Sequence, residues 1–303
     1  MQSRRLAFIG DVHGRHEKLN RLLTVLDARE PGIFYVFMGD LIDNKPDPAL
    51  NQLKVLTRVK ALVDAGRALC LMGNHELNAV GWALGHPRSG EPLRAHSSNN
   101  RKQHGAFLAE VGEGSAAHQQ WLAWFRQRPL YADFGDIRAV HACWDPQALE
   151  ILAPALNPDR SLLENRWQDA FNPHDPLNHA VDTLLKGPEL PLPDGYTFTD
   201  KTGHLRRNIR VRWWLQQAHS YRQLAQVPPA AEEAIPDLPL PERVTFTPPP
   251  VTVVIGHYTL SGAPRALAEK VICVDYNAAK GDFPLVAWCR DAAGRGYFID
   301  SNA

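Results

Sequence analysis

The chain of 303 residues lacks the features that mark several specialised classes of protein. No apolar run approaches the roughly 20 residues of a membrane-spanning helix, so we expect no membrane partner. Lysine and arginine together number 33, as do aspartate and glutamate, and this zero net charge disfavours a general nucleic-acid binder. A local basic patch would still be compatible with this balance. Residues 1–5 lead directly into the first apolar run, so we expect no signal peptide.

Cysteine is also scarce. The four cysteines are far apart and have no spacing typical of a zinc motif: Cys70, Cys143, Cys273 and Cys289. Most lie inside apolar runs, where free cysteine is a common core residue. We therefore expect reduced thiols and a cytoplasmic location.

Polar residues of metal-ligand type follow five apolar runs of strand length. The runs 6–9, 34–38, 68–72, 138–140 and 251–255 end at Asp11, Asp40, Asn74, His141 and His257. A single Gly-Asp after a strand is most simply a turn, because both residues favour turns. Five such ends favour a shared site instead, since the carboxyl ends of strands in open α/β sheets meet at a ligand-binding crevice. We expect Asp40 to be the hub of a two-metal site.

The apolar spacing predicts an α/β fold. Helical periodicity over 16–26 and 48–65 alternates with strands from residue 6 to residue 73, which predicts parallel strands. Helices with loops are expected over 81–128, and a hairpin turns at Gly135-Asp136. The C-terminal part returns to strands at 251–255, 271–274, 284–289 and 296–299. The architecture expected is two packed sheets with helices outside.

The region 154–250 carries most of the prolines of the chain. We expect it to be an irregular cap inserted in a single domain, 1–303, with little secondary structure. One helix is predicted within it, over 209–224, carrying Trp213 and Trp214.

The motifs around these strand ends resemble those of the calcineurin-like metallophosphoesterase superfamily. They are Gly10-Asp11-Val12-His13-Gly14, Gly39-Asp40-Leu41-Ile42-Asp43, Gly73-Asn74-His75-Glu76, Val140-His141 and Gly256-His257. The resemblance is greatest to the branch that contains serine/threonine phosphoprotein phosphatases and symmetrical diadenosine tetraphosphatases. It implies a four-layer fold, with two packed mixed β-sheets flanked by helices.

The resemblance also implies a binuclear metal centre. Asp11 and His13 would hold one cation, Asp40 would bridge, and Asn74, His141 and His257 would hold the other. Ligands of this kind without cysteine suit Mn, favoured here, or Fe, Zn or Mg. A metal-bridging hydroxide would attack phosphorus, and His75 would protonate the leaving oxygen as general acid, oriented by Asp43. Alternatively, His75 would be a histidine in a turn that only forms hydrogen bonds to the backbone. Glu76 is expected to support the structure rather than the chemistry.

The substrate side departs from the family pattern. Relatives usually carry arginine directly after the residue equivalent to Asp43, but here Asn44 and Lys45 follow, and lysine lacks the planar arginine fork. Candidates to replace it are Arg206, Arg207, Arg210 and Arg212; a solvated basic helix face is the alternative. Arg210 and Arg212, beside Trp213, suit a phosphate with a stacked base. Tyr276 either lines the site or packs ordinarily.

The remaining histidines have no comparable context in the sequence. His96, His104, His118, His174, His179 and His219 are expected to be surface or hydrogen-bonded residues.

The function expected is a metal-dependent phosphoesterase, a hydrolase of a phosphomonoester or phosphoanhydride. Its partner would be a phosphorylated small molecule, a nucleotide such as a dinucleoside polyphosphate, or a phosphoprotein. Alternatives are a phosphatase or phosphodiesterase acting on nucleotide or RNA ends, and a non-catalytic binding module of the same fold.

Overall fold

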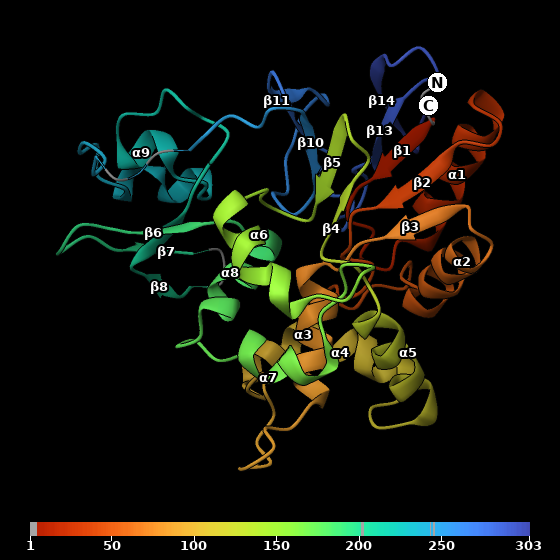
Figure 1. Cartoon of the computed structure of the whole chain (residues 1–303), viewed down its shortest axis with the longest axis horizontal. Coiled ribbons are helices and arrows are strands. Elements are labelled where there is room, and N and C mark those ends of the chain that lie inside the picture. Colours follow the sequence, from red (N-terminus) through yellow and green to blue (C-terminus); the bar gives the residue numbers. More distant parts are fainter. Residues whose placement is uncertain (1–4, 201–202, 243, 245) are drawn as a thin grey trace.

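The apolar runs of the sequence form the central strands of two five-stranded sheets (Figure 1). The computed structural model describes residues 5–200, 203–242, 244 and 246–303. Residues 1–4, on which the expectation about a signal peptide partly rests, lie outside the described residues.

The first sheet has the strand order β14-β13-β1-β2-β3. Its strands are β1 (Leu6–Ile9), β2 (Phe34–Phe37), β3 (Ala68–Cys70), β13 (Val286–Arg290) and β14 (Gly296–Asp300). β1, β2 and β3 are parallel, as the alternation of strands and helices predicts, whereas β13 and β14 are antiparallel additions. The sheet therefore joins segments from both ends of the described chain.

The second sheet has the order β11-β12-β10-β5-β4. Its strands are β4 (Tyr131–Asp133), β5 (Ile137–Val140), β10 (Thr252–Ile255), β11 (Ala266–Ala268) and β12 (Val271–Cys273). β5 and β12 flank β10 in parallel, and β4 and β11 are antiparallel edges. The hairpin predicted around Gly135-Asp136 is confirmed by the pairing of β4 with β5.

The two sheets pack face to face through alternate residues of their strands. Leu6 and Phe8 of β1 share one buried cluster with Ala139 of β5 and Val254 of β10. Ala7 and Ile9 belong instead to the larger cluster that includes the helices. Because side chains alternate across a strand, each central strand is buried on both faces. This packing is the two-sheet core that the sequence predicts.

Helices cover the outer faces. Two helices connect the parallel strands of the first sheet: α1 (His16–Arg29) and α2 (Gln52–Asp64). Three more follow β3: α3 (Asn74–Ala83), α4 (Ser98–Val111) and α5 (Ala116–Arg126). α1 and α2 lie against the first sheet, and α3, α4 and α5 gather beyond β3 (Figure 1). Among the helices of the described ranges, none is long and apolar enough to cross a bilayer.

The segment 154–250, called the cap here, carries more regular structure than predicted. From β5 onward the chain forms α6 (Pro146–Leu152), α7 (Trp167–Ala170), α8 (Pro176–Lys186), α9 (Tyr221–Leu224) and the 3₁₀ turns Ala153–Ala155, Glu164–Arg166 and Pro229–Ala234. Two small ladders join β6 (Glu189–Pro191) to β9 (Asn208–Arg210) and β7 (Phe198–Thr199) to β8 (Leu205–Arg206). α8 was missed, although Leu177, Val181 and Leu184 give it a buried face.

The helix predicted over 209–224 is wrong. The segment begins as strand β9, and only Tyr221–Leu224 is helical. Ile209, Val211 and Trp213 are buried at every second position, which is the period of a strand rather than of a helix. Pairing with β6 and with the backbone of Leu224 and Gln226 supplies the hydrogen bonds that a helix would have made internally.

Candidate metal centre

Loops from both sheets meet at the seam between them. The backbone amides of Val12 and His13, after β1, donate to the carbonyl of Asp40, after β2, at 3.0 and 2.9 Å. The amide of Gly256, after β10, donates to the carbonyl of His141, after β5, at 2.8 Å. Asn74 opens α3 directly after β3. The carboxyl ends of the central strands thus converge, as expected for an α/β site.

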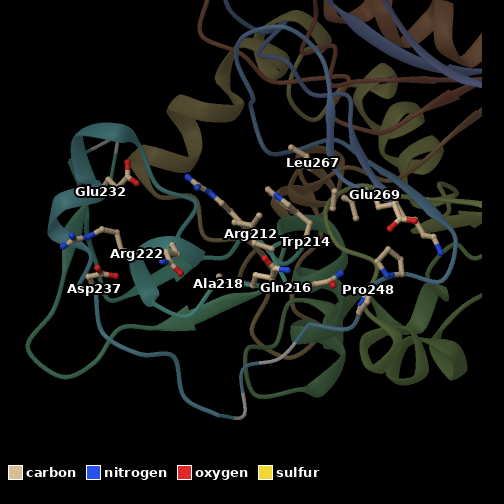
Figure 2. A pocket seen from close by; sticks show the side chains of 17 residues that line it. Arg212, Trp214, Gln216, Ala218, Arg222, Glu232, Asp237, Pro248, Leu267 and Glu269 are labelled. Atoms are coloured by element: carbon tan, nitrogen blue, oxygen red, sulfur yellow. The ribbon is translucent and has the colours of Figure 1, made fainter.

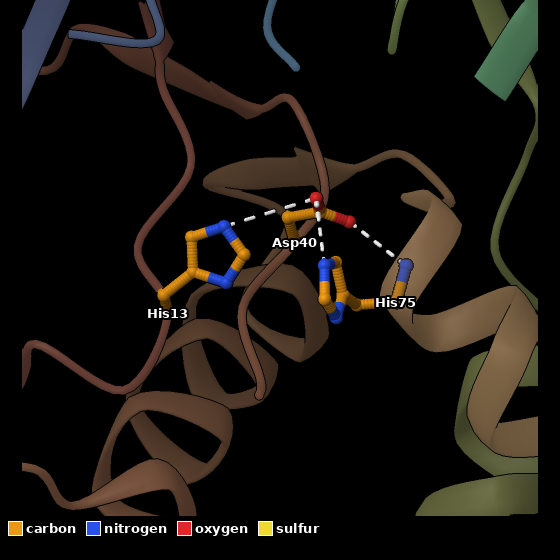
Figure 3. A group of neighbouring side chains, drawn as sticks. All are labelled: His13, Asp40 and His75. Carbon is orange, nitrogen blue, oxygen red and sulfur yellow. Dashed lines mark hydrogen bonds and ion pairs between the residues drawn. The ribbon is translucent and has the colours of Figure 1, made fainter. Parts of the chain in front are cut away.

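Three histidine rings point at one oxygen of Asp40. The Nε2 atoms of His13 and His75 lie 3.8 Å from Asp40 Oδ2, and that of His141 lies 3.3 Å away. Figure 3 shows His13 and His75 on either side of the Asp40 carboxylate. Two groups of potential ligands result, His13 with Asp40 and His75, and Asp40 with His141 and His257. Asp40 is the side chain that both groups contain.

The other predicted ligands border the same cluster. Both oxygens of Asp11 accept from the backbone amide of His257, at 3.1 and 3.3 Å. The amide oxygen of Asn74 lies 3.1 Å from His141 Nε2. The structure therefore brings all six residues predicted to bind metal to one place.

The donor set fits divalent cations. His13 Nδ1 lies 2.8 Å from the carbonyl oxygen of Asp43, and His141 Nδ1 lies 2.6 Å from that of Met38, so in both rings Nε2 is left to face the cluster. Within the described part of the chain, His257 Nε2 is buried without a hydrogen-bond partner. A buried ring nitrogen without a partner beside carboxylates is what a metal ligand looks like in the absence of its cation.

The buried carboxylates of the centre change the protonation of the groups around them. Burial and the nearby charges of Asp275 and Asp40 raise the pKa of Asp11 well above its ordinary value. Burial disfavours the charged form of His141, but Asp40 and Asp11 outweigh it and raise the pKa of His141 to about 10. His141 would thus hold a proton that balances the carboxylates, and bound cations would take over that balancing role.

His75 lies between Asp40 and Asp43, the two aspartates of the preceding motif. Its Nδ1 is 2.8 Å from Asp43 Oδ2, and its backbone amide donates to Asp40 Oδ1 at 2.9 Å. Burial opposes protonation of the ring, but Asp40 and Asp43 raise the pKa of His75 to about 9. A cationic imidazole whose Nε2 faces the cluster is chemically able to give a proton there.

Sequence reasoning missed the second partner of Asp43. His104, on α4, is fully buried and its Nδ1 lies 2.7 Å from Asp43 Oδ1. The polar run 96–104 concealed it. One signal was present, because His104 stands at helical spacing from Phe107, Leu108 and Val111, the buried residues of α4.

Glycine precedes four of the ligands because the strands approach too closely for a side chain. A Cβ at Gly73 would lie 2.3 Å from both the amide nitrogen and Oδ1 of Asp40. A Cβ at Gly256 would lie 2.3 Å from Asp11 Oδ1. The recurring Gly-ligand pairs of the sequence therefore reflect the tight packing of the seam itself.

Glu76 has the supporting position expected for it. Its carboxylate accepts from the amides of Asp40 and Leu41 at 2.9 and 2.8 Å, and from that of Gly73 at 3.1 Å. Burial and the charge of Asp40 raise the pKa of Glu76 to about 7. Glu76 thus fixes the backbone that carries Asp40.

Three of the residues predicted to bind substrate have different surroundings: Asn44 and Tyr276 are hydrogen-bonded within the protein, and Lys45 is exposed. The amide of Asn44 donates to the carbonyls of His13 and Ala279, so this side chain ties loops together. Lys45 is exposed. Tyr276 is buried, and its hydroxyl bonds to the backbone of Arg265, which corresponds to the packing alternative.

Arg210 and Arg212 differ in their surroundings. Burial and the positive charge of Arg210 lower the pKa of His257 well below its ordinary value, so the Arg210 guanidinium acts electrostatically on the centre. Across the described residues, Arg210 Nε is buried and without a partner. Arg212 instead donates to Gln226 and lines an open cavity of about 890 Å³ with Trp214 and Glu269 (Figure 2). Among the described residues lining that cavity, none is a predicted metal ligand.

Known proteins share both the sequence pattern and the fold. The symmetrical bis(5'-nucleosyl)-tetraphosphatase of Vibrio cholerae is 28% identical over 186 residues, which are 58% of this chain and 62% of that protein. The protein of the same name from Methylococcus capsulatus is 26% identical over 271 residues, 84% of this chain and 81% of that one. The first of these alignments thus spans less than two thirds of the relative.

A solved structure of a cold-active protein tyrosine phosphatase has the same overall fold. It is 16% identical, with a TM-score of 0.50 over 98% of this chain and 78% of that chain. The family model of calcineurin-like phosphoesterases matches residues 4–288, which is nearly the whole sequence. Together with the strand-end motifs and the two-sheet architecture, this match establishes that the chain belongs to the calcineurin-like phosphoesterase family.

Proposed function

We propose that this protein is a binuclear metal-dependent phosphohydrolase that cleaves a phosphomonoester or phosphoanhydride. One observation carries the proposal: Asp40 belongs to two adjacent groups of side chains able to hold a metal ion, one that contains His13 and one that contains His141 and His257, so this one carboxylate can serve two cations. Membership of the phosphoesterase family supports it.

The residues have distinct roles in this proposal. Asp11, His13, Asp40, Asn74, His141 and His257 would hold the cations. Two divalent cations, when bound, would neutralise the charge of the transferring phosphoryl group and supply a nucleophile from water near neutral pH. His75 donates a proton from Nε2 to the leaving oxygen. Asp43 holds Nδ1 and so orients the ring.

Arg210 is our candidate for binding the phosphate. Its positive charge acts on His257, and its buried Nε has no partner among the described residues, so an anion bound at the centre would give it one. Asn44 stands where the resemblance to the family implies an arginine, and its amide is already used between two loops. The phosphate contact would therefore come from the cap rather than from the Asp43 loop.

Among substrates, we favour a dinucleoside polyphosphate. The support comes from relatives whose names are bis(5'-nucleosyl)-tetraphosphatase, including one aligned over 84% of this chain. We also propose manganese as the working cation, since the set of oxygen and imidazole donors suits it. A cytoplasmic location is consistent with four cysteines, all within the described residues, that are buried free thiols.

The activity is tested with purified protein, p-nitrophenyl phosphate and diadenosine tetraphosphate, after chelation and after addition of Mn²⁺. We expect turnover that requires the metal and release of two molecules of ADP from diadenosine tetraphosphate. His75→Asn should lower kcat by about 10²–10⁴-fold, the usual contribution of general acid catalysis, while metal content stays unchanged. Loss of metal on His75→Asn would instead make His75 a ligand.

The role of Arg210 needs a separate comparison. Arg210→Gln should raise KM for phosphate esters, whereas Arg207→Gln, an exposed neighbour in the same cap segment, should leave KM unchanged. If both substitutions change KM equally, Arg210 does not bind the phosphate, and the assignment of the protein as a hydrolase is unaffected.

A further inference from the structure

The Asp43 carboxylate is shared by two imidazoles, one on each oxygen. Oδ2 lies 2.8 Å from His75 Nδ1, and Oδ1 lies 2.7 Å from His104 Nδ1. The aspartate itself is 2% exposed and His104 is 0% exposed, so water does not substitute for either contact. Each oxygen of the carboxylate therefore has a fixed donor, and its plane is defined by both.

The surroundings of His104 allow its ring to donate a hydrogen bond from Nδ1 but not from Nε2. Its ring packs against Phe107 at 5.2 Å and Trp82 at 5.8 Å between ring centroids. Within the described residues its Nε2 is buried and has no hydrogen-bond partner. A proton at Nε2 would be buried against aromatic rings without an acceptor, so the ring holds its hydrogen on Nδ1, where Asp43 accepts it.

Within the described part of the chain, the hydrogen bond of His104 goes to Asp43 and not to a side chain of the two groups around Asp40. Its effect on chemistry must therefore pass through Asp43. Arg94 interacts electrostatically with Asp43, but its hydrogen bonds go to Asn100 and Gln103 of α4, and the structure gives none from Arg94 to Asp43. Without His104, Oδ1 of a buried carboxylate would lose this donor, and the carboxylate would be free to turn away from His75.

We infer that His104 is a positioning residue that holds Asp43 so that His75 presents Nε2 to the leaving oxygen. The inference rests on the proposed function, because it assigns His104 to the proton-donating side of that reaction. It makes α4, which carries no predicted ligand, part of the catalytic apparatus.

The test uses the dependence of rate on the leaving group. A substrate with a poor leaving group, phenyl phosphate, needs the proton from His75, whereas 2,4-dinitrophenyl phosphate does not. Replacing His104 by leucine, which removes the donor and keeps the volume, should slow phenyl phosphate turnover by about 10–100-fold, the usual effect of removing such an outer partner. The rate with 2,4-dinitrophenyl phosphate should change far less, and KM and metal content should stay the same.

Two further variants separate positioning from folding. His104→Asn keeps an N–H donor near the place of Nδ1 and should recover most of the phenyl phosphate rate. His118→Leu removes another buried histidine, one that packs on Phe107 and accepts from Gly114 but does not touch Asp43. It should lower stability without changing the leaving-group dependence.

A double mutant completes the test. In His75→Asn the proton donor is gone, so adding His104→Leu should cost no further rate on phenyl phosphate. If the two losses multiply, or if His104→Leu slows both substrates equally, the inference is overturned while the hydrolase assignment stands. If the unmodified protein hydrolyses neither substrate with Mn²⁺, the proposed function fails first.

Discussion

Four residues of the centre hold backbone conformations that side chains normally avoid. His13, Asp40, Asp43 and His257 have φ values of 46°, 52°, 65° and 67°. Such left-handed conformations cost on the order of 1 kcal/mol or more per residue, and they persist only where neighbours enforce them. Here the enforcing contacts are the backbone hydrogen bonds between loops and the carboxylate of Glu76. The centre is therefore sensitive to small changes next to it.

Substitution of Gly73 tests this sensitivity. Gly73→Ala would place a methyl group against Asp40 and should destabilise the protein by about 1–3 kcal/mol, the usual effect of overpacking, with loss of bound metal. Gly105→Ala is the matched control, because its Cβ meets no described atom within 4 Å in the middle of α4. It should stabilise the protein by roughly 0.5–1 kcal/mol. Urea unfolding and metal analysis of both variants would decide, and a fully metallated Gly73→Ala protein would contradict the close packing.

Glu76 gives a second prediction for a single residue. Glu76→Gln places an amide group against three backbone donors of the Asp40 loop, so we expect metal affinity to fall by about 10–100-fold. Glu110→Gln is the control, since Glu110 also accepts from two backbone amides, those of Gln52 and Leu53, but at the start of α2. Titration with Mn²⁺ should separate the two; a similar loss in both would assign Glu76 to general stability alone.

At the scale of elements, α1 holds the loop after β12. Lys18 Nζ donates to the carbonyls of Ala278, Gly281 and Phe283 at 2.8, 2.6 and 2.7 Å. Arg15 adds two hydrogen bonds to the carbonyl of Ala279. The loop therefore has its shape set by side chains from the first half of the chain, next to the His13 loop.

Lys18→Met tests this attachment. The variant keeps the aliphatic length but leaves these three carbonyls, and that of Lys280 at 3.3 Å, without their charged donor. We expect a loss of stability of about 1.5–3 kcal/mol, typical of hydrogen bonds to a charged group. Amide exchange in 277–283 should accelerate. Lys54→Met, at an exposed position of α2, should change neither. Unchanged exchange in Lys18→Met would mean that other contacts hold the loop.

Elements whose form is set locally were predictable from the sequence. The strands before Asp11, Asp40 and His257 are short apolar runs ended by glycine, and they form where expected. The cap was not predictable in the same way. Trp213 and Val211 are buried in a pattern set by pairing with distant segments. Because the sequence does not reveal this pairing, the segment 209–224 was wrongly predicted to be a helix. His104 was missed because a polar helix N-terminus hid the buried face behind it.

At the scale of the whole molecule, protons and metal should compete for the same site. His75 and His141 have pKa values raised to about 9 and about 10 in the metal-free protein, above the ordinary 6.5. Raised values of this kind stabilise the folded state fully below about pH 6.5, and the stabilisation is lost as the pH rises through 9–10. Thermal unfolding of chelator-treated protein should therefore show a falling Tm from pH 6.5 to pH 9.

The metal-loaded protein is the comparison for this prediction. Cations replace the protons, so the Tm of protein with Mn²⁺ should fall less over the same range, and Mn²⁺ should bind more tightly as the pH rises. A Tm of the metal-free protein that increases with pH would contradict the charge balance described for the centre.

The position of β1 between β2 and β13 constrains how the protein can be made. A nascent chain that has left the ribosome as far as α3 already contains Asp11, His13, Asp40 and Asn74, but β1 still lacks one of its neighbours. That neighbour is synthesised after His141 and His257. The proposed set of metal ligands is therefore complete only after translation of almost the entire chain, and a prematurely truncated product would carry only part of it.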